Sequence, residues 1–290
     1  MDGTDLNSLV APFALADLST RPGFDDAAES LARGSLRAFA QADDAGRWMF
    51  RDIGRGSLYL ATVVLNAAGG VTASSLASEA RTHRIASRGR VMAFLRRAEA
   101  CGELTVPPGT GGWTQRRLIL GPRFIDRFRR CNLVCAEAVA PLAPEVASLV
   151  ARLGEDAFFN KFVLGVATAG PVAIALDQAS GYRERLFLDR DCGIGMLFRL
   201  MCGQPRPRAR LLEQAQLSRA ALAREFGVSR AHINRLLADA TAQELLYCPT
   251  SDRVVFSPAL SADVERMIVR TLQVTRTALL IAAQGRQVSL

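Results

Sequence analysis

The sequence predicts a mainly α-helical protein with small β-hairpins, built as two tandem copies of one unit that pair within a single chain as a pseudo-dimer. The first observation is a repeated phrase: RDIGRGSLYL, which begins at Arg51, returns as RDCGIGMLFRL from Arg190. The second is that each copy continues with two apolar patterns of helical spacing and then two short strand-like stretches around a turn. We therefore assign residues 1–153 and 154–290 to the two copies.

The distance between equivalent segments stays nearly constant along the chain. The phrase recurs after 139 residues, and the segment SRGRVMAFLRRAEA at Ser87 recurs after 142 as SRAHINRLLADATA at Ser229. Pro122 corresponds to Pro258, 136 residues later, and short insertions in each copy explain the drift. This predicts one head at about residues 51–122 and another at about 190–258, each followed by a terminal helix.

The second copy has the clearer local signals. Ser218 is typical of a helix N-cap, and Gly227 is typical of a helix end. A second helix then begins at Ser229, and its buried face is predicted to hold Ile233, Leu236, Leu237 and Ala240. The segment ELLYCPTSDRVVFSP follows and is predicted to form a β-hairpin. Two helices joined by a tight turn and followed by a hairpin are thus expected.

The polar side of this second helix carries residues that can read DNA bases. Arginine pairs with guanine and asparagine with adenine in the major groove. The candidate contacts of this head are Ser229, Arg230, His232, Asn234, Arg235 and, in the hairpin, Arg253. The alternative reading of the same pattern is a plain helical hairpin with a solvated polar face.

The first copy repeats the order of elements with a poorer base-reading set. Helices are expected in SLYLATVVLNAAGG, TASSLASEARTH and SRGRVMAFLRRAEACG, and a hairpin from ELTV to RRLILGP. Met92 and Ala93 occupy the places of Asn234 and Arg235, so this head would bind mainly the DNA backbone or a different sequence. Its candidate contacts are Arg84, Ser87, Arg88, Arg90, Arg116 and Arg117.

The segments LAREFGVSRAHINRLL and SRGRVMAFLRRAEACGELTV resemble the winged helix-turn-helix transcription regulators, most of all the MarR-type branch. The resemblance covers roughly residues 51–130 and 190–270. It implies a wing beside each recognition helix and terminal helices that form a dimer interface. Members of that family are usually homodimers of a shorter chain, whereas this chain carries both heads itself.

Charge and residue usage limit the remaining classes of function. The formal net charge of +8 and the arginine-rich basic set, in which Lys161 is the only lysine, favour a polyanionic partner, although a GC-rich genome produces the same arginine bias. The six cysteines form no CxxC pair, so we expect no metal and no cofactor. The start lacks the features of a signal peptide, which predicts a cytoplasmic, nucleoid-associated protein.

The apolar tract from Phe162 to Leu176 is too short for a membrane span and contains Gly170-Pro171, so it predicts two buried helix halves that meet at a break. We expect no enzymatic activity, because neither histidine has a nucleophile partner in a recognisable motif. Cys131 and Cys135 are interpreted as buried small residues rather than a thiol sensor. The repeated RD-x-G-x-G is interpreted as capping or ion-pairing residues with closely packed glycines, rather than a phosphate cradle.

The sequence therefore predicts a transcription regulator that binds double-stranded DNA in a sequence-specific manner, with two unequal heads on one asymmetric site. Further expected partners are RNA polymerase and a second copy of the chain. We expect no interaction with a membrane. Two alternatives stay open at this point. One is a replication initiator of plasmid or phage type with tandem winged helices, and the other is a winged-helix scaffold that binds proteins.

Overall fold

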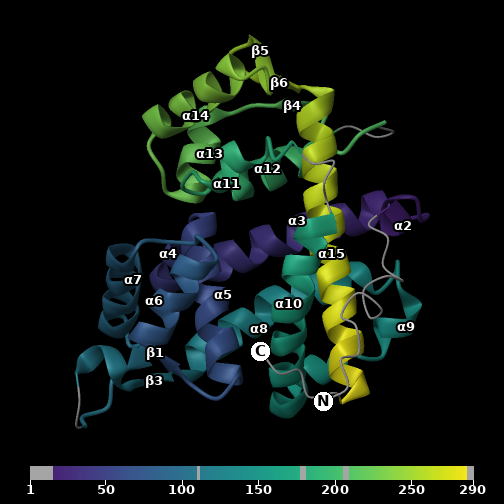
Figure 1. Ribbon diagram of the computed structural model, residues 1–290. Coiled ribbons are helices and arrows are strands. Elements are labelled where there is room, and N and C mark those ends of the chain that lie inside the picture. Colours follow the sequence, from purple (N-terminus) through teal and green to yellow (C-terminus); the bar gives the residue numbers. More distant parts are fainter. Residues whose placement is uncertain (1–15, 110–111, 177–180, 205–208, 286–290) are drawn as a thin grey trace.

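The computed structural model describes residues 16–109, 112–176, 181–204 and 209–285 (Figure 1). It is mainly helical and contains two small antiparallel sheets of three strands each. The prediction of a mainly α fold with small β-hairpins is confirmed.

The two segments around the repeated phrase contain the same order of elements, namely helix, strand, two helices, two strands and a long helix. In the first segment these are α5 (Ile53–Ala67), β1 (Val71–Thr72), α6 (Ala73–Thr82), α7 (Arg88–Ala100), β2 (Leu104–Thr105), β3 (Arg117–Leu120) and α8 (Pro122–Val139). In the second they are α12 (Gly193–Cys202), β4 (Gln214–Gln216), α13 (Arg219–Phe226), α14 (Arg230–Ala242), β5 (Leu246–Thr250), β6 (Arg253–Phe256) and α15 (Pro258–Gln284). Both sheets place the last strand in the middle, in the orders β1-β3-β2 and β4-β6-β5.

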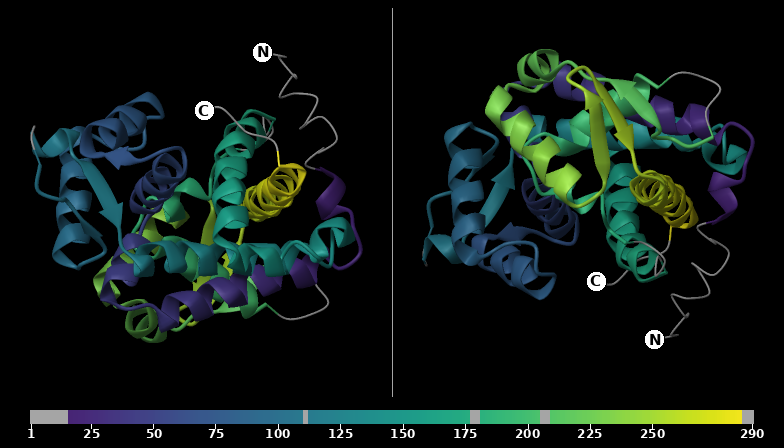
Figure 2. Two further views of the ribbon diagram at one scale, coloured as in Figure 1. Left: turned by 90° about the horizontal axis from the view of Figure 1, so that it is seen from below. Right: turned by 90° about the horizontal axis from the view of Figure 1, so that it is seen from above.

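The remaining elements precede these segments. They are α2 (Ala16–Ser19), α3 (Phe24–Gln41), α4 (Asp44–Met49), α9 (Pro144–Ala147), α10 (Asp156–Leu176) and α11 (Arg185–Leu188), with a short 3₁₀ turn at Ala151–Gly154. Another 3₁₀ turn, Trp113–Gln115, lies between β2 and β3 of the first segment. Helix α3 packs against α8 and also against α12, while α10 packs against α15 and also against α5 (Figures 1 and 2). The helix that precedes each head therefore covers the first helix of the other head, and the two copies are interlaced.

Helix α10 corrects one expectation. The tract with Gly170-Pro171 was predicted to break, but α10 continues through Pro171 to Leu176. Its neighbour α15 comes so close that a Cβ atom at Gly165 would lie 2.9 Å from the Cα of Ala278. Pro171 lies on an exposed side of the helix, where water can hydrate the carbonyl group that loses its partner. Packing along α15 thus outweighs the local penalty of the proline. No helix in the described ranges has both the length and the apolar character needed to cross a membrane.

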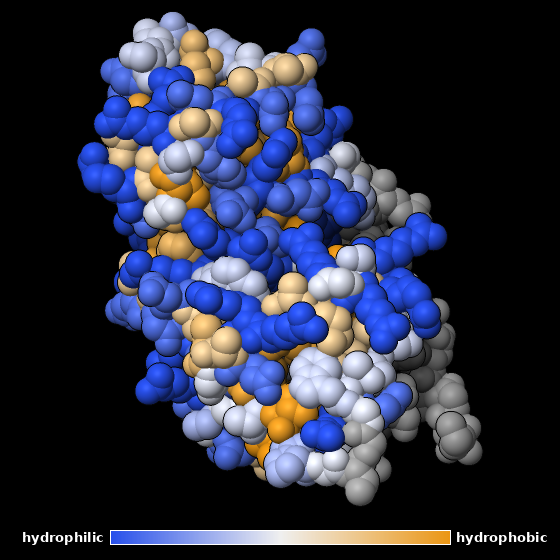
Figure 3. Space-filling model, turned by 90° about the vertical axis from the view of Figure 1, so that its left-hand side faces the viewer, coloured by the Kyte–Doolittle hydropathy of each residue, from blue (hydrophilic) through white to orange (hydrophobic). Residues whose placement is uncertain are grey.

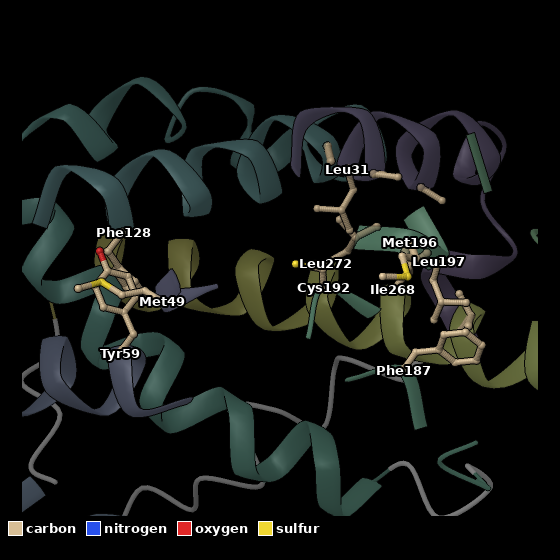
Figure 4. Close-up of a cluster of buried hydrophobic side chains, with 14 of the residues drawn as sticks. Leu31, Met49, Tyr59, Phe128, Phe187, Cys192, Met196, Leu197, Ile268 and Leu272 are labelled. Carbon is tan, nitrogen blue, oxygen red and sulfur yellow. The ribbon is translucent and has the colours of Figure 1, made fainter. Parts of the chain in front are cut away.

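A continuous core joins the two copies. Figure 4 shows Leu31 of α3 among Met196 and Leu197 of α12 and Leu272 of α15. Elsewhere in the core, Tyr59 packs against aromatic rings of α8, with 4.3 Å between its ring centroid and that of Phe124. Full burial of a large apolar side chain stabilises a fold by about 1.5 to 3 kcal/mol. This core draws on helices from both copies and so packs the two segments against each other.

Candidate nucleic-acid interface

Helices α7 and α14 lie on the same side of the molecule, at the left of Figure 1. Figure 3 looks at that side, which is mostly hydrophilic with scattered apolar groups. The two helices are the second members of the two helix pairs, so equivalent elements of both copies lie on one side of the molecule. This is the arrangement that one extended partner would require.

The local sequence fixes where α14 begins. Gly227 adopts the left-handed conformation with φ 62°, which ends α13 and turns the chain. The hydroxyl oxygen of Ser229 then accepts a hydrogen bond of 3.1 Å from the backbone N–H of His232. The predicted stripe is buried, namely Ile233, Leu236, Leu237 and Ala240. The caps and the buried face predicted for this helix are confirmed.

The exposed side of α14 combines small residues with free polar groups. Ala231, Arg235 and Ala238 follow the i, i+4, i+7 spacing of one face and are exposed. Arg230 and Asn234 flank this face, and neither they nor Arg235 have a side-chain hydrogen bond or ion pair among the described residues. Small side chains let a partner approach the helix backbone closely. The arginines and the asparagine retain their full bonding capacity for that partner.

Helix α7 has a similar surface with more charge. The Ser87 hydroxyl accepts a hydrogen bond of 3.4 Å from the Arg90 N–H, so this predicted cap is also present. Gly89, Ala93 and Arg96 form its exposed central face, and Arg88 lies beside it. Sequence reasoning missed Arg96, although its i, i+4, i+7 relation to Gly89 and Ala93 is the signal that locates it.

Arg90 and His232 have partners inside the protein, although both were predicted DNA contacts. Arg90 Nη2 donates to Asp52 Oδ1 at 2.8 Å, and His232 Nε2 lies 3.0 Å from the carbonyl oxygen of Asp191. A carbonyl oxygen only accepts, so Nε2 of His232 carries the proton. Arg90 and His232 occupy equivalent positions in the two copies. They anchor α7 and α14 to the two copies of the RD-x-G-x-G phrase, which are called the RD motifs below and begin at Arg51 and Arg190.

The remaining predicted DNA contacts lie in the turn before α7 and in the two hairpins. Arg84 lies in the turn before α7 with φ 52° and is exposed, and Arg116 is half-buried. Arg117 and Arg253 occupy matching places, since each is an exposed first residue of the central strand of its sheet. Arg117 lies across Gly70, where a Cβ atom would be 2.8 Å from its Nε, and Arg253 donates to the side chain of Gln214.

A hollow of about 460 Å³ lies between α6, the start of α7 and the turn at Thr114. Its polar lining consists of Ser74, Ser78, Arg81, Ser87, Arg88 and Thr114, and no acidic residue in the described part of the chain contributes to it. Neither Arg81 nor Arg88 has a hydrogen-bond or ion-pair partner among the described residues. Two unpaired guanidinium groups, hydroxyls and the N-terminus of α7 all favour an anion here. Arg81 is a second residue that sequence reasoning missed.

The two heads differ in charge. Residues 71–120 contain eight arginines and three acidic residues, whereas residues 214–256 contain five arginines and four acidic residues. One of the three acidic residues of the first head, Glu103, is buried against Arg127. The first head is therefore the more strongly positive of the two.

Cys131 and Cys135, which lie on α8, were interpreted as buried small residues. Burial raises the pKa of the Cys131 thiol to about 11 and that of Cys135 to about 12. Both thiols are therefore neutral at pH 7, whereas a redox sensor needs a thiolate. Among the described residues, no group of three or more histidine, cysteine and acidic side chains is arranged to hold a metal ion.

Comparison of the chain with protein-family models, with curated proteins and with solved structures finds no match.

Proposed function

We propose that this protein is a sequence-specific transcription regulator that binds double-stranded DNA with two unequal winged helix-turn-helix heads of the MarR-like kind. The observation that carries the proposal is the exposed face of α14, on which Arg230, Asn234 and Arg235 are free beside small residues. A helix of this kind can enter the major groove and present hydrogen-bonding groups to base edges. The order of elements around α7 and α14 supports the same assignment.

The two heads divide the work of recognition. In the second head, Arg230, Asn234 and Arg235 contact base edges. The first head supplies affinity that depends little on sequence, through the arginines that surround its hollow and its hairpin, because phosphate contacts position a protein without reading bases. The target is then an asymmetric site rather than a palindrome. Its two parts lie about 34 to 36 Å apart, one turn of the double helix.

The wider setting follows from this assignment. A DNA-binding regulator acts in the cytoplasm at the nucleoid and performs no catalysis. RNA polymerase and a second copy of the chain are its further proposed partners. Ser87 and Ser229, which cap α7 and α14, orient the first turns toward phosphate.

The experiment that tests this function is selection of bound fragments from randomised duplex DNA with the full chain. The variant Arg230→Ala with Asn234→Ala is compared with Arg130→Ala, which removes a charge from the exposed side of α8. The expected result is a defined motif that the double variant loses and the control keeps. Loss of either base contact should cost about 1 to 3 kcal/mol on the specific site only. Equal loss on specific and random DNA would remove the base-reading assignment.

A second candidate function has its own support. Ile119 in β3 and Tyr247 in β5 are 54% and 57% exposed on the two hairpins. Each hairpin thus offers one exposed apolar side chain to a protein partner, and on this basis a scaffold that binds proteins is the second candidate. In that case the exposed arginines would be dispensable, no DNA motif would be enriched even at low salt, and binding of the partner would depend weakly on salt.

A further inference from the structure

The two copies of the RD motif meet at the junction between the heads. Arg51 and Asp52 precede α5 of the first head, and Arg190 and Asp191 precede α12 of the second. The backbone N–H of Cys192 donates to the carbonyl oxygen of Arg51 at 2.5 Å. Direct backbone contact between the two motifs shows that they form one structural unit.

The aspartates of the two motifs have different roles, because the helix that follows each motif begins at a different position relative to the aspartate. Asp52 is the N-cap of α5, and its carboxylate accepts the N–H of Arg55 at 2.9 Å. In the second copy the N-cap is Cys192, one residue later, in the left-handed conformation with φ 60°. The carboxylate of Asp191 is thereby released from capping.

That carboxylate is used between the copies instead. Its oxygens lie 3.7 Å from Nε of Arg51 and 3.7 Å from Nη1 of Arg55, both of the first copy. Arg51 also donates from Nη2 to the carbonyl oxygen of Gly227 at 3.0 Å, in the turn that leads into α14. All three contacts cross from the first head to the second.

These contacts complete a polar chain from α7 to α14. It begins with Arg90 on Asp52 at 2.8 Å and passes from Asp52 to Arg55 at 3.2 Å. From Arg55 it crosses to Asp191, whose carbonyl oxygen contacts His232 of α14 at 3.0 Å. The two exposed helices are thus tied together by side chains at their own first turns, apart from the hydrophobic core.

We propose that Arg51, Arg55 and Asp191 are positioning residues that fix the separation of α7 and α14 and thereby select the spacing between the two parts of the DNA site. The placement of the helices is a property of the free protein. The consequence for DNA rests on the proposed function. Because helical DNA presents its grooves periodically, a fixed separation rejects sites whose parts are moved out of phase.

The first test measures the free protein. Spin labels are introduced as unnatural amino acids at Ala93 and Ala238, since the chain has six native cysteines, and the distribution of distances between them is recorded. Arg51→Ala is compared with Arg199→Ala, which removes an ion pair of 3.2 Å with Glu225 between α12 and α13, within the second head. Arg51→Ala should broaden or shift the distribution and Arg199→Ala should not. Superimposable distributions for Arg51→Ala and the parent protein would overturn the proposal.

Arg51→Lys distinguishes positioning from a general effect on folding. Lysine loses the bonding pattern of the guanidinium but keeps the positive charge that faces Asp191. If that charge positions the helices, the distribution of label distances should return most of the way to that of the parent. An Arg51→Lys distribution as broad as that of Arg51→Ala, with melting temperatures unchanged in both, would exclude the pairing with Asp191 as the cause.

The second test uses DNA. The selected site is compared with one in which the two parts are moved apart by about 5 base pairs, half a helical turn. The parent should prefer the original spacing, and Arg51→Ala should reduce this preference about fivefold, in line with partly exposed ion pairs. An unchanged preference would overturn the spacing claim. If the parent binds no DNA, the proposed function fails, while the label distances still decide whether the junction positions the helices.

Discussion

Arg127 and Glu103 form a buried ion pair with two hydrogen bonds, Nη1 to Oε2 at 2.9 Å and Nη2 to Oε1 at 3.0 Å. Their side chains are 7% and 2% exposed. The pair joins α8 to the turn before β2, and Asp43, the N-cap of α4, approaches Nη2 of Arg127 at 2.9 Å. Burial alone lowers the pKa of Arg127, but its hydrogen bond and charge interaction with Glu103 outweigh this and raise it. Arg127 therefore stays charged and needs its partner.

The first prediction follows from this pair. Glu103→Gln should lower the free energy of unfolding by about 3 to 5 kcal/mol, because it leaves the buried guanidinium with only the half-exposed carboxylate of Asp43 as a counter-charge. Asp43→Asn should cost only about 0 to 1 kcal/mol from its ion pair, since that carboxylate is half exposed. Urea denaturation of both variants gives the comparison. Joint replacement by Glu103→Gln and Arg127→Met should recover part of the loss, and equal effects of the two single variants would contradict this account.

Local structure was predictable from the sequence where one short pattern decides it. Ser218 and Ser229 are helix N-caps, and Gly227 ends α13. The sequence predicts these roles because the hydrogen bonds of a helix cap join residues only a few positions apart. The buried stripe of α14 followed from spacing alone. The unbroken α10 was not predictable, because its continuity depends on α15, more than 80 residues away in sequence.

The candidate interface was predictable only in part, for the same reason. Helical spacing placed Arg230, Asn234 and Arg235 on the exposed side of α14. It could not show that Arg90 and His232 turn toward Asp52 and Asp191, because those partners come from distant segments. Arg81 was missed because the hollow forms only when α6, α7 and the turn at Thr114 come together.

The second prediction concerns the acid sensitivity of the fold. Asp263 on α15 is fully buried, and its carboxylate accepts N–H bonds from Arg183 at 3.0 Å and Gly181 at 3.2 Å. Burial alone raises the pKa of Asp263, but these bonds and the side chains of Arg183 and Arg266 outweigh it and lower the pKa below its ordinary value. A lowered carboxyl pKa means that the contribution to stability is complete above the unfolded pKa of about 3.9 and is lost as the pH falls through the folded pKa.

Asp263→Asn should therefore destabilise the protein by about 1 to 3 kcal/mol at pH 7. The difference from the parent should shrink as the pH falls below about 4, where the parent carboxylate is protonated. Thermal unfolding at a series of pH values measures this. Burial raises the pKa of the neighbouring Glu184, so its contribution to stability changes with pH in the opposite sense. The charge of Asp263 also raises the pKa of Glu184, and Asp263→Asn removes that part of the shift. A difference that stays constant down to pH 2 would refute the role of Asp263.

The third prediction uses salt to count phosphate contacts. The slope of log affinity against log salt concentration is negative for DNA binding. If the hollow and the hairpin of the first head bind the DNA backbone, Arg81→Ala and Arg117→Ala should each reduce the magnitude of this slope by about one unit. The loss should be the same on specific and random DNA, since phosphates carry no sequence information. Arg253→Ala is the matched change in the second head. Fluorescence anisotropy over a range of salt concentrations provides the slopes, and slopes equal to that of the parent would remove these residues from the interface.

The fourth prediction uses substitutions at the N-caps of α7 and α14 to separate an effect on folding from an effect on DNA binding. Aspartate is as good an N-cap as serine, so Ser229→Asp should keep α14 and the melting temperature of the protein intact. The same change puts a negative charge at the helix start that is proposed to face phosphate, and DNA affinity should fall at least about tenfold at low salt. Ser87→Asp makes the equivalent change at α7. Because the first head supplies mainly backbone contacts, Ser87→Asp should weaken binding equally on all sequences, whereas Ser229→Asp should also erase the preference for the selected motif. Unchanged affinity in both stable variants would show that the starts of α7 and α14 do not face DNA.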